Sequence, residues 1–214
     1  MAIFVFMIKA IIFDIGGVLI DLDKRRCIEA FHSLGISEID ELLDDCHQKG
    51  IFLDMETGRL SEAGFYDECR KLSKLKITDN EIKNAFLSFC IGIKAEKLLY
   101  LKELSDKYDL YFLSNNNPIV MREFNLDLQN YGLDIETSFK DRFISYELGI
   151  AKPNIEIFRI ADTRIGRPAE EILYIDDSEN NVKAAEKMCW NTLLYQIGTD
   201  LKDATEQKLN SLKK

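Results

Sequence analysis

The feature that most constrains this chain is an apolar run that ends in one carboxylate and two glycines. Residues 11–13 are Ile-Ile-Phe, Asp14 follows them, and Gly16 and Gly17 come next. A continuous β-branched and aromatic run is typical of a strand buried on both faces, as in a parallel sheet covered by helices. Because ligands of open α/β sheets bind outside the carboxyl ends of the strands, Asp14 is a candidate nucleophile or metal ligand. For this residue alone, an aspartate that merely caps a turn is the alternative.

Further apolar runs alternate with helical patterns along the chain. They predict strands at residues 109–114, 143–145, 171–175 and 192–195. Strand and helix alternation indicates an α/β fold whose core is a doubly wound, Rossmann-like parallel sheet. The carboxyl ends of such strands share one edge, so we expect the polar residues that follow them to lie near Asp14. Those residues are Ser114, Lys152, Asp176 and Asp177.

The adjacent carboxylates Asp176 and Asp177 carry a separate implication. Two neighbouring negative charges at a strand end are costly unless something positive compensates them. A hard cation such as Mg²⁺, which prefers oxygen ligands, would do so.

Residues 18–90 differ in character from the rest, because helical periodicity with charged faces replaces the strand pattern. Helices are predicted at residues 26–34, 37–49, 61–72 and 78–89. Thr78 and Glu81 have the spacing of a capping box. We therefore predict a core domain of residues 1–17 and 91–214, with a four-helix cap domain of residues 18–90 inserted into it. This segment has 15 acidic and 10 basic residues, so it is unsuited to a polyanion.

Composition narrows the class of protein and its partners. Hydrophobic residues make up 46% of the chain and charged residues 30%, which is ordinary globular usage. The formal net charge is -9, so nucleic acid and anionic membranes would be repelled and are not expected as partners. A small anionic substrate stays possible, since a site can be locally positive.

The cysteines and the first residues bear on location. Five widely spaced cysteines and two histidines form no convincing zinc site, and the pattern is that of a reduced, cytoplasmic protein. Residues 1–7 are apolar but lack the basic region of a signal peptide. We interpret them as a strand extension, or as an upstream start before Met7.

Four motifs in order resemble the haloacid dehalogenase (HAD)-like hydrolase superfamily, and specifically its phosphatases with a helical, C1-type cap. Residues 13–19, Phe-Asp-Ile-Gly-Gly-Val-Leu, match the first motif. Leu113-Ser114-Asn115 matches the second, Lys152-Pro153 the third and Ile175-Asp176-Asp177 the fourth. The resemblance covers essentially the whole chain.

The resemblance implies a role for each matched residue. Asp14 would attack phosphorus and become a transient aspartyl phosphate, with Lys152 neutralising the phosphate and orienting Asp14. Ser114 and the Asn115 backbone would bind phosphate oxygens. Mg²⁺ would be held by Asp14, the Gly16 main-chain carbonyl and Asp176, with Asp177 as a direct or supporting ligand. The implied activity is Mg²⁺-dependent hydrolysis of a small phosphorylated metabolite, such as a sugar phosphate, by a monomer or weak homodimer.

The first motif departs from the usual family pattern at one position. The family's second aspartate, a general acid and base two residues after the nucleophile, is Gly16 here. General acid-base assistance is worth roughly 10²–10⁴-fold, so its loss would favour good leaving groups. Asp21 lies close in sequence and is a candidate replacement.

Two other functions remain open from the sequence. A 2-haloacid dehalogenase has a similar fold and aspartate nucleophile but needs no Mg²⁺, and paired carboxylates would repel its carboxylate substrate. A catalytically idle phosphate-binding or interaction module is the other, since fold alone does not establish activity.

Overall fold

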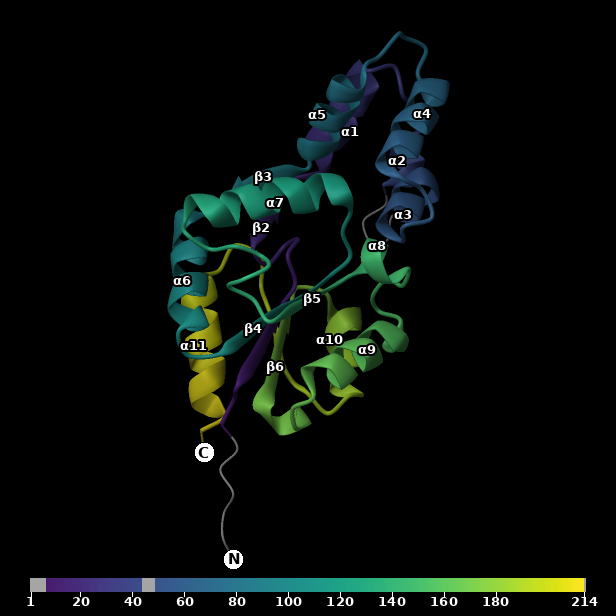
Figure 1. Cartoon of the computed structure of the whole chain (residues 1–214). Helices are drawn as coiled ribbons and strands as arrows, with labels where there is room; N and C mark the ends of the chain where they lie inside the picture. Colours follow the sequence, from purple (N-terminus) through teal and green to yellow (C-terminus); the bar gives the residue numbers. More distant parts are fainter. Residues whose placement is uncertain (1–6, 44–48, 214) are drawn as a thin grey trace, which may run out of the picture.

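The core of the protein is a five-stranded parallel sheet, seen edge-on among its helices in Figure 1. The computed structural model describes residues 7–43 and 49–213. In spatial order the strands are β5 (Asp141–Ile144), β4 (Asp109–Ser114), β1 (Ala10–Phe13), β6 (Ile172–Asp176) and β7 (Asn191–Leu194). The chain winds outward from β1 in both directions. The predicted doubly wound α/β core is therefore confirmed.

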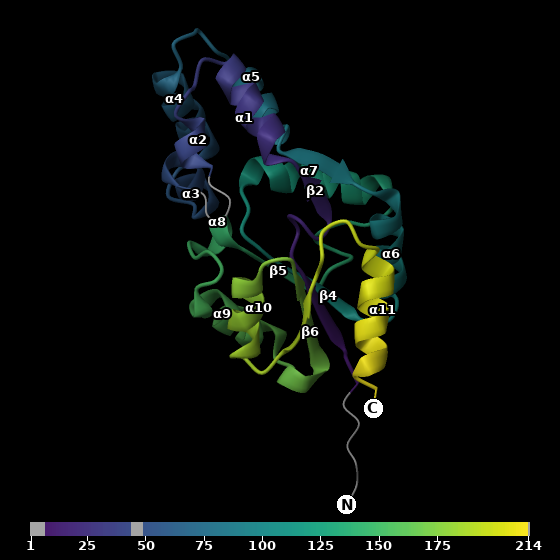
Figure 2. The ribbon, with the colours of Figure 1, turned by 180° about the vertical axis from the view of Figure 1, so that it is seen from behind.

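Both faces of β1 are buried, as its apolar sequence requires. Ile11 and Phe13 pack into one side-chain cluster, whereas Ala10 and Ile12 pack into the other. This alternation follows from the two-residue period of a strand. The first face is covered by α6 (Ala95–Ser105), α7 (Pro118–Asn130) and α11 (Leu201–Ser211), and the second by α9 (Ile155–Ile165) and α10 (Glu179–Glu186), as Figures 1 and 2 show.

Two short connections complete the core. The helix α8 (Ser145–Leu148) follows β5 directly, and the 3₁₀ helix η1 (Ala169–Glu171) leads into β6. The loops after β1, β4, β5 and β6 all emerge at one edge of the sheet, because the strands are parallel. That edge is where polar residues from distant parts of the sequence meet.

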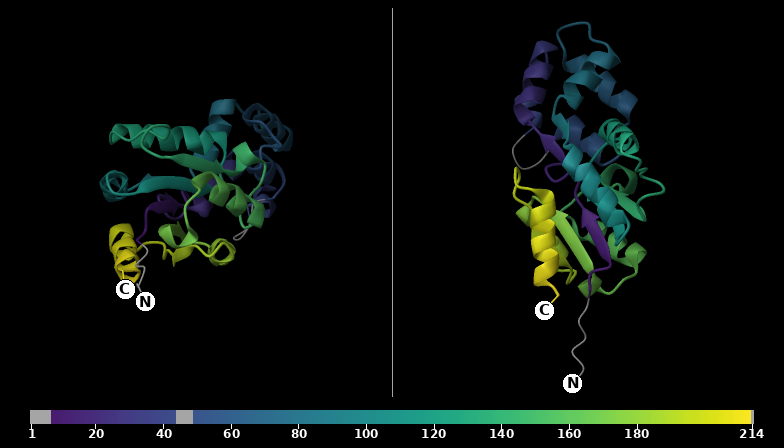
Figure 3. Two further views of the ribbon diagram at one scale, coloured as in Figure 1. Left: turned by 60° about the horizontal axis from the view of Figure 1, so that its bottom comes forward. Right: turned by 90° about the vertical axis from the view of Figure 1, so that its left-hand side faces the viewer.

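A helical insert lies beyond this edge, as the right-hand view of Figure 3 shows. The chain enters it through β2 (Ile20–Leu22) and returns through β3 (Cys90–Ile93), and these strands pair antiparallel. The helices between them are α1 (Lys24–Ser33), α2 (Ile39–Leu42), α3 (Gly50–Glu56), α4 (Glu62–Leu72) and α5 (Asp79–Leu87). The predicted capping box of Thr78 and Glu81 is present at the start of α5.

Four phenylalanines hold these helices together. Phe52 of α3 lies at the centre, with ring centroids 5.6 Å from Phe31, 5.2 Å from Phe65 and 5.6 Å from Phe86. All four rings are buried. Each comes from a different helix, so the cluster gives the insert a hydrophobic core of its own.

The described part of the insert has five helices where four are predicted. A single helix over residues 37–49 is wrong, because α2 ends at Leu42 and Lys49 has an extended backbone before α3 begins at Gly50. The sequence pattern also missed α3 and the β2–β3 ribbon. The division into a core of residues 1–17 and 91–214 and a cap of residues 18–90 stays a prediction, and the ribbon lies where it places the boundary.

Some expectations fall outside what can be described. The strand extension and alternative start proposed for residues 1–6 lie outside the described residues, as do Cys46 and His47. Within the described ranges, the helices are too short or too polar to cross a lipid bilayer.

Candidate active site

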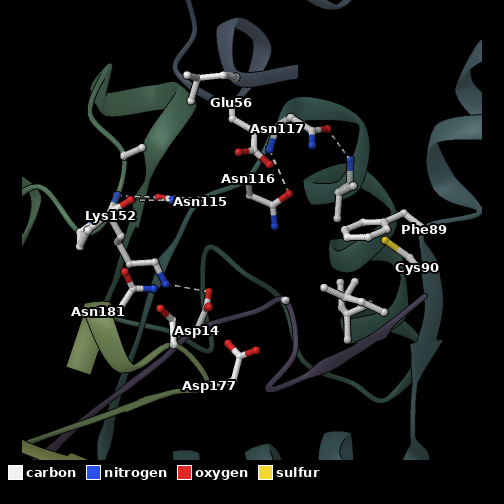
Figure 4. A pocket seen from close by; sticks show the side chains of 18 of the residues that line it. Asp14, Glu56, Phe89, Cys90, Asn115, Asn116, Asn117, Lys152, Asp177 and Asn181 are labelled. Carbon is white, nitrogen blue, oxygen red and sulfur yellow. Dashed lines mark hydrogen bonds and ion pairs between the residues drawn. The ribbon is translucent and has the colours of Figure 1, made fainter. Parts of the chain in front are cut away.

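Asp14 stands at the carboxyl end of the central strand, where the sequence predicts it. Its backbone N–H donates to the Ile175 carbonyl over 2.9 Å, which continues the pairing of β1 with β6 by one residue. Its carboxylate accepts a hydrogen bond of 2.7 Å from the Ile15 N–H. Only 8% of the residue is exposed, and it lines a cavity of about 370 Å³ between the sheet edge and the insert (Figure 4).

Lys152 reaches Asp14 from the loop before α9. Its Nζ lies 3.0 Å from Asp14 Oδ1 and 2.7 Å from Asp176 Oδ2. Burial alone would lower the pKa of Lys152, but the charges of Asp14 and Asp176 outweigh burial and raise it. The ammonium is therefore a fixed positive charge between two carboxylates, not a solvated charge on a surface loop.

The electrostatics of Asp14 reflect its crowded, buried setting. The pKa of Asp14 is raised to about 7 as the net result of several effects: burial raises it most, the charge of Lys152 lowers it, and the charges of Asp176 and Asp177 raise it. A hydrogen bond from Ser114 also lowers the pKa. Additional positive charge beside Asp14 would favour its ionised form, which is the form that acts as a nucleophile.

Three carboxylates supply the donor set for such a charge. One oxygen each of Asp14, Asp176 and Asp177 lies within 4.8 Å of the others. Gly16, whose carbonyl is a predicted ligand, lines the same cavity. An all-oxygen set of this kind suits Mg²⁺, so the residues present fit the ion that the motifs imply.

Asp176 and Asp177 have different surroundings, which bears on their roles. Asp176 is fully buried and accepts hydrogen bonds from Lys152, Tyr174, Ser178 and Asn181. Asp177 lines the cavity and accepts no hydrogen bond from another described residue. Burial and the charge of Asp176 raise the pKa of Asp177. We therefore propose the reverse of the predicted emphasis, with Asp177 as the direct metal ligand and Asp176 as its support.

The loop after β4 contributes in a way that the sequence did not indicate. Asn115 Nδ2 donates to the Lys152 carbonyl over 3.0 Å, and the Lys152 N–H donates to Asn115 Oδ1 over 2.7 Å. This reciprocal pair fixes the backbone that carries the lysine. Ser114 is 1% exposed and its hydroxyl interacts with the Asp14 carboxylate, so its single proton would have to turn from Asp14 to bind the predicted phosphate.

The two glycines after Asp14 have different conformations. Gly17 has a φ of 75°, in the left-handed region, whereas Gly16 does not. The backbone conformation of Gly16 is therefore one that a residue with a side chain can adopt. A Cβ on Gly16 would lie 3.2 Å from the flexible end of Leu22, whereas one on Gly17 would lie 2.3 Å from Asp177 Oδ2.

Replacement of Gly17 by alanine is expected to weaken metal binding. The new methyl group must displace the Asp177 carboxylate, and disturbing a metal site in this way typically costs about 10–100-fold in affinity. We expect a matching rise in the Mg²⁺ concentration that gives half-maximal activity.

Gly149→Ala is the matched control for Gly17→Ala, because Gly149 has a φ of 71° and no atom lies within 4 Å of the place that a Cβ would take. It should cost about 1–2 kcal/mol of stability and leave the Mg²⁺ requirement unchanged. Equal Mg²⁺ curves for Gly17→Ala and wild type would show that Asp177 is not a ligand.

Asp21 is not placed to replace the missing second aspartate. Its carboxylate lies 2.8 Å from Lys97 Nζ and 3.5 Å from Lys94 Nζ, and it does not line the cavity. Partial burial would raise the pKa of Asp21, but hydrogen bonds and charge from Lys97 and Lys94 lower it overall. An anion held by two lysines is a poor proton donor.

Glu56 is a cavity residue that the sequence did not indicate. It is the last residue of α3, is 8% exposed and lines the cavity opposite Asp14 (Figure 4). The one signal in the sequence is its position four residues after Phe52, which puts a carboxylate on the buried face of an amphipathic helix. The missed boundary of α3 hid that signal.

Comparison with known proteins gives consistent matches over the whole chain. The family model for haloacid dehalogenase-like hydrolases matches residues 8–188. D-ribitol-5-phosphate phosphatase of Bacteroides thetaiotaomicron is 34% identical over 208 residues, covering 96% of this chain and 100% of that protein.

The solved structures that this chain resembles agree with the family match. A HAD family enzyme of Bacteroides thetaiotaomicron, solved with magnesium and inorganic phosphate, is 36% identical with a TM-score of 0.83, covering 90% of this chain and 96% of that one. A predicted HAD-like hydrolase of Porphyromonas gingivalis is 35% identical with a TM-score of 0.86, covering 95% and 98%. An L-2-haloacid dehalogenase of Xanthobacter autotrophicus is 16% identical with a TM-score of 0.54, a likeness of fold alone.

Proposed function

Because this chain belongs to the haloacid dehalogenase-like hydrolase family, we propose that it is a Mg²⁺-dependent phosphatase that hydrolyses the phosphomonoester of a small polyol or sugar. The observation that carries the proposal is the contact of Lys152 with Asp14, 3.0 Å apart, beside two further carboxylates. A carboxylate nucleophile, a buried cation and a hard-metal donor set are the parts that phosphoryl transfer from an ester requires.

Asp14 carries the covalent step of the proposed mechanism. Its free carboxylate oxygen attacks phosphorus, the bond to the leaving alcohol breaks, and an aspartyl phosphate forms. Water then attacks phosphorus and releases inorganic phosphate, which restores Asp14. The hydrogen bond from the Ile15 N–H and the ion pair with Lys152 hold the carboxylate in place for both steps.

Charge is the main obstacle, since a carboxylate must approach a phosphate dianion. Lys152 offsets that repulsion with its buried ammonium group. The Asn115 side chain holds the backbone of Lys152 in place through two hydrogen bonds. Asp14, Asp177 and the Gly16 carbonyl would hold Mg²⁺, with Asp176 in support. When bound, the ion supplies further positive charge beside the phosphate oxygens.

The cavity supports a substrate with one phosphate and an uncharged leaving group. Lys152 is the one cationic side chain among the described residues that line it. The wall away from Asp14 is mostly apolar and includes Leu53, Phe86 and Val120. A second phosphate or a carboxylate there would be left without a partner. The relative's named substrate, D-ribitol 5-phosphate, has the proposed character, and we propose an alditol or sugar phosphate of similar size.

The alternatives fit less well. In a dehalogenase, Asp176 and Asp177 would repel the carboxylate of the substrate. Burying an ammonium and two carboxylates costs desolvation free energy. A catalytically idle module would gain nothing from this arrangement. The oligomeric state, a monomer or weak homodimer, stays a prediction, and so does the cytoplasmic location.

Removal of Mg²⁺ is expected to stop turnover. In EDTA, release of phosphate from ribitol 5-phosphate and a panel of sugar phosphates should fall by at least about 10²-fold, since the ion contributes several kcal/mol to the transition state. Excess Mg²⁺ should restore it. Chloride release from 2-chloropropionate in EDTA, with no phosphate release in Mg²⁺, would instead identify a dehalogenase. Neither product from any substrate would favour the idle module.

A further inference from the structure

A polyol phosphate has a difficult leaving group, and the residue that usually assists it is missing. An alkoxide leaves slowly unless it is protonated as the bond to phosphorus breaks, and positioned acid catalysis contributes roughly 10²–10⁴-fold. Gly16 stands where the resembled family has its acid and base, and Asp21 is held by Lys94 and Lys97 outside the cavity. If the proposed function holds, another group must supply the proton.

The cavity offers few candidates among the described residues. Its titratable side chains are Asp14, Glu56, Cys90, Lys152 and Asp177. Asp14 is the nucleophile, Asp177 is a metal ligand, and Lys152 is committed to Asp14 and Asp176. Burial raises the pKa of the Cys90 thiol to about 11, which makes it a weak acid at neutral pH. Glu56 remains.

Glu56 has the features of an unassigned functional group. It is 8% exposed, and neither a hydrogen bond nor an ion pair joins its carboxyl group to any residue in the described ranges. Its oxygens are not among the buried polar atoms that lack a partner in the described residues, so they reach the open space of the cavity, where a substrate can contact them. Among the cavity residues contributed by helices α3 and α5, Leu53, Glu56 and Phe86, it alone is polar.

Its position faces the reaction. Figure 4 shows Glu56 entering the cavity from the insert, on the wall opposite Asp14 and Asp177. In an in-line displacement the leaving oxygen points away from the nucleophile. With phosphorus beside the free oxygen of Asp14, on the cavity side of the Asp14–Lys152 ion pair, the leaving oxygen is therefore directed toward the wall that carries Glu56.

Its protonation state suits an acid. The pKa of Glu56 is raised to about 8 overall, because burial and the charge of Asp14 raise it more than the charge of Lys152 lowers it. The carboxyl group therefore holds its proton at neutral pH, as a general acid must.

Contacts between the insert and the core keep Glu56 in this place. Gly58, two residues after it, approaches α8 so closely that a Cβ there would lie 2.4 Å from the Tyr146 carbonyl. Arg122 of α7 pairs with Glu62 of α4 over 2.9 Å. The first contact holds the end of α3 against the sheet edge, and the second holds the start of the next helix, α4, against α7.

We propose that Glu56 is the general acid and base of this phosphatase, supplied by the cap in place of the residue at Gly16. As Asp14 bonds to phosphorus, the Glu56 carboxyl proton passes to the leaving oxygen, and the free alcohol departs. The Glu56 carboxylate then accepts a proton from the water that attacks phosphorus. Hydrogen phosphate leaves, Asp14 returns as a carboxylate and Glu56 is protonated again.

The test is the Glu56→Gln variant of the full chain, assayed with two kinds of leaving group. In pre-steady-state measurements with Mg²⁺, release of the alcohol from ribitol 5-phosphate, or the best alkyl phosphate of the panel, should slow by at least about 10²-fold. The first release of p-nitrophenol from p-nitrophenyl phosphate should change less than about threefold, because that leaving group needs no proton. Acid quenching should then trap more phosphoprotein than in wild type.

Asp54→Asn is the matched control, since Asp54 lies on the same helix but pairs with Arg59 at the surface. It should behave as wild type with both substrates. If Glu56→Gln slowed the release of the alcohol and of p-nitrophenol by the same factor, the proposal would be overturned. A rise in KM with unchanged kcat would overturn it as well. Loss of the proposed function itself is recognised separately, as absence of phosphate release by wild type from any substrate.

Discussion

Replacement of Asp14 by asparagine is expected to lower kcat/KM by at least about 10⁴-fold, the scale seen when an enzyme loses its nucleophile. The amide keeps the shape of the carboxylate and can still accept the hydrogen bond from the Ile15 N–H. It lacks the negative charge that attacks phosphorus, so no aspartyl phosphate can form. Phosphate release measures the loss, and acid quenching followed by mass spectrometry measures the intermediate.

The matched control for Asp14→Asn is Asp23→Asn, a carboxylate-to-amide change outside the cavity. Asp23 caps α1 by accepting from the Arg25 and Arg26 N–H groups, and asparagine caps a helix equally well. This variant should keep wild-type activity. If a folded Asp14→Asn protein kept substantial activity, or if phosphate were still trapped on it, the nucleophile would be another residue.

The sheet and the meeting of the polar groups at its edge followed from simple features of the sequence. An apolar run with residues 11–13 at its centre predicts a strand buried on both faces, and helix alternation requires that strand to be parallel to its neighbours. Parallel strands bring their carboxyl ends together. Asp14, Lys152 and Asp176 therefore meet although they lie far apart in the sequence.

The contents of the cavity did not follow from sequence in the same way. The local pattern around residues 37–56 does not say where a helix stops, because the start of α3 after the extended Lys49 also depends on how α3 packs Phe52 into the aromatic cluster. Missing α3 meant missing Glu56. The two hydrogen bonds between the Asn115 side chain and the Lys152 backbone could not be predicted from the sequence either. An asparagine in a turn can bond to many neighbouring groups, and only the fold brings Lys152 next to it.

The different settings of Asp176 and Asp177 are a further case. As adjacent acidic residues they are equivalent in the sequence, and only the alternation of side chains at the end of β6 separates them. Asp176 turns inward to Lys152 and Asn181, and Asp177 turns to the cavity. The members of a metal site can thus be predicted from the sequence, whereas the role proposed for each member depends on the fold.

Lys152→Met is the second large prediction, and it concerns stability as well as rate. Loss of the ammonium removes a preorganised charge beside the phosphate, so kcat/KM should fall by at least about 10²-fold. In EDTA the change also leaves Asp14 and Asp176 buried without a cation, and breaking a buried pair typically costs about 3–5 kcal/mol. Urea unfolding measures this loss.

The pH dependence of that loss identifies its cause. Burial already raises the pKa of Asp14 to about 7 in the presence of Lys152, and removing the lysine raises it further. A carboxyl group whose pKa is higher in the folded state than in the unfolded state binds its proton more tightly when folded, so stability rises as pH falls. The deficit of metal-free Lys152→Met should therefore be largest above the raised Asp14 pKa of the variant and shrink as the pH falls to about 7, below which Asp14 is protonated in both folded proteins.

Two further variants separate charge from geometry in this prediction. Lys140→Met removes an exposed lysine and should leave both rate and stability close to wild type. Lys152→Arg keeps the charge but replaces a compact ammonium by a planar guanidinium, so it should recover more stability than activity. Loss of a preorganised charge is expected to lower the rate by ~10²-fold. If Lys152→Met lowered it by less than about tenfold, this lysine would lie outside the reaction, and its contact with Asp14 would serve folding alone.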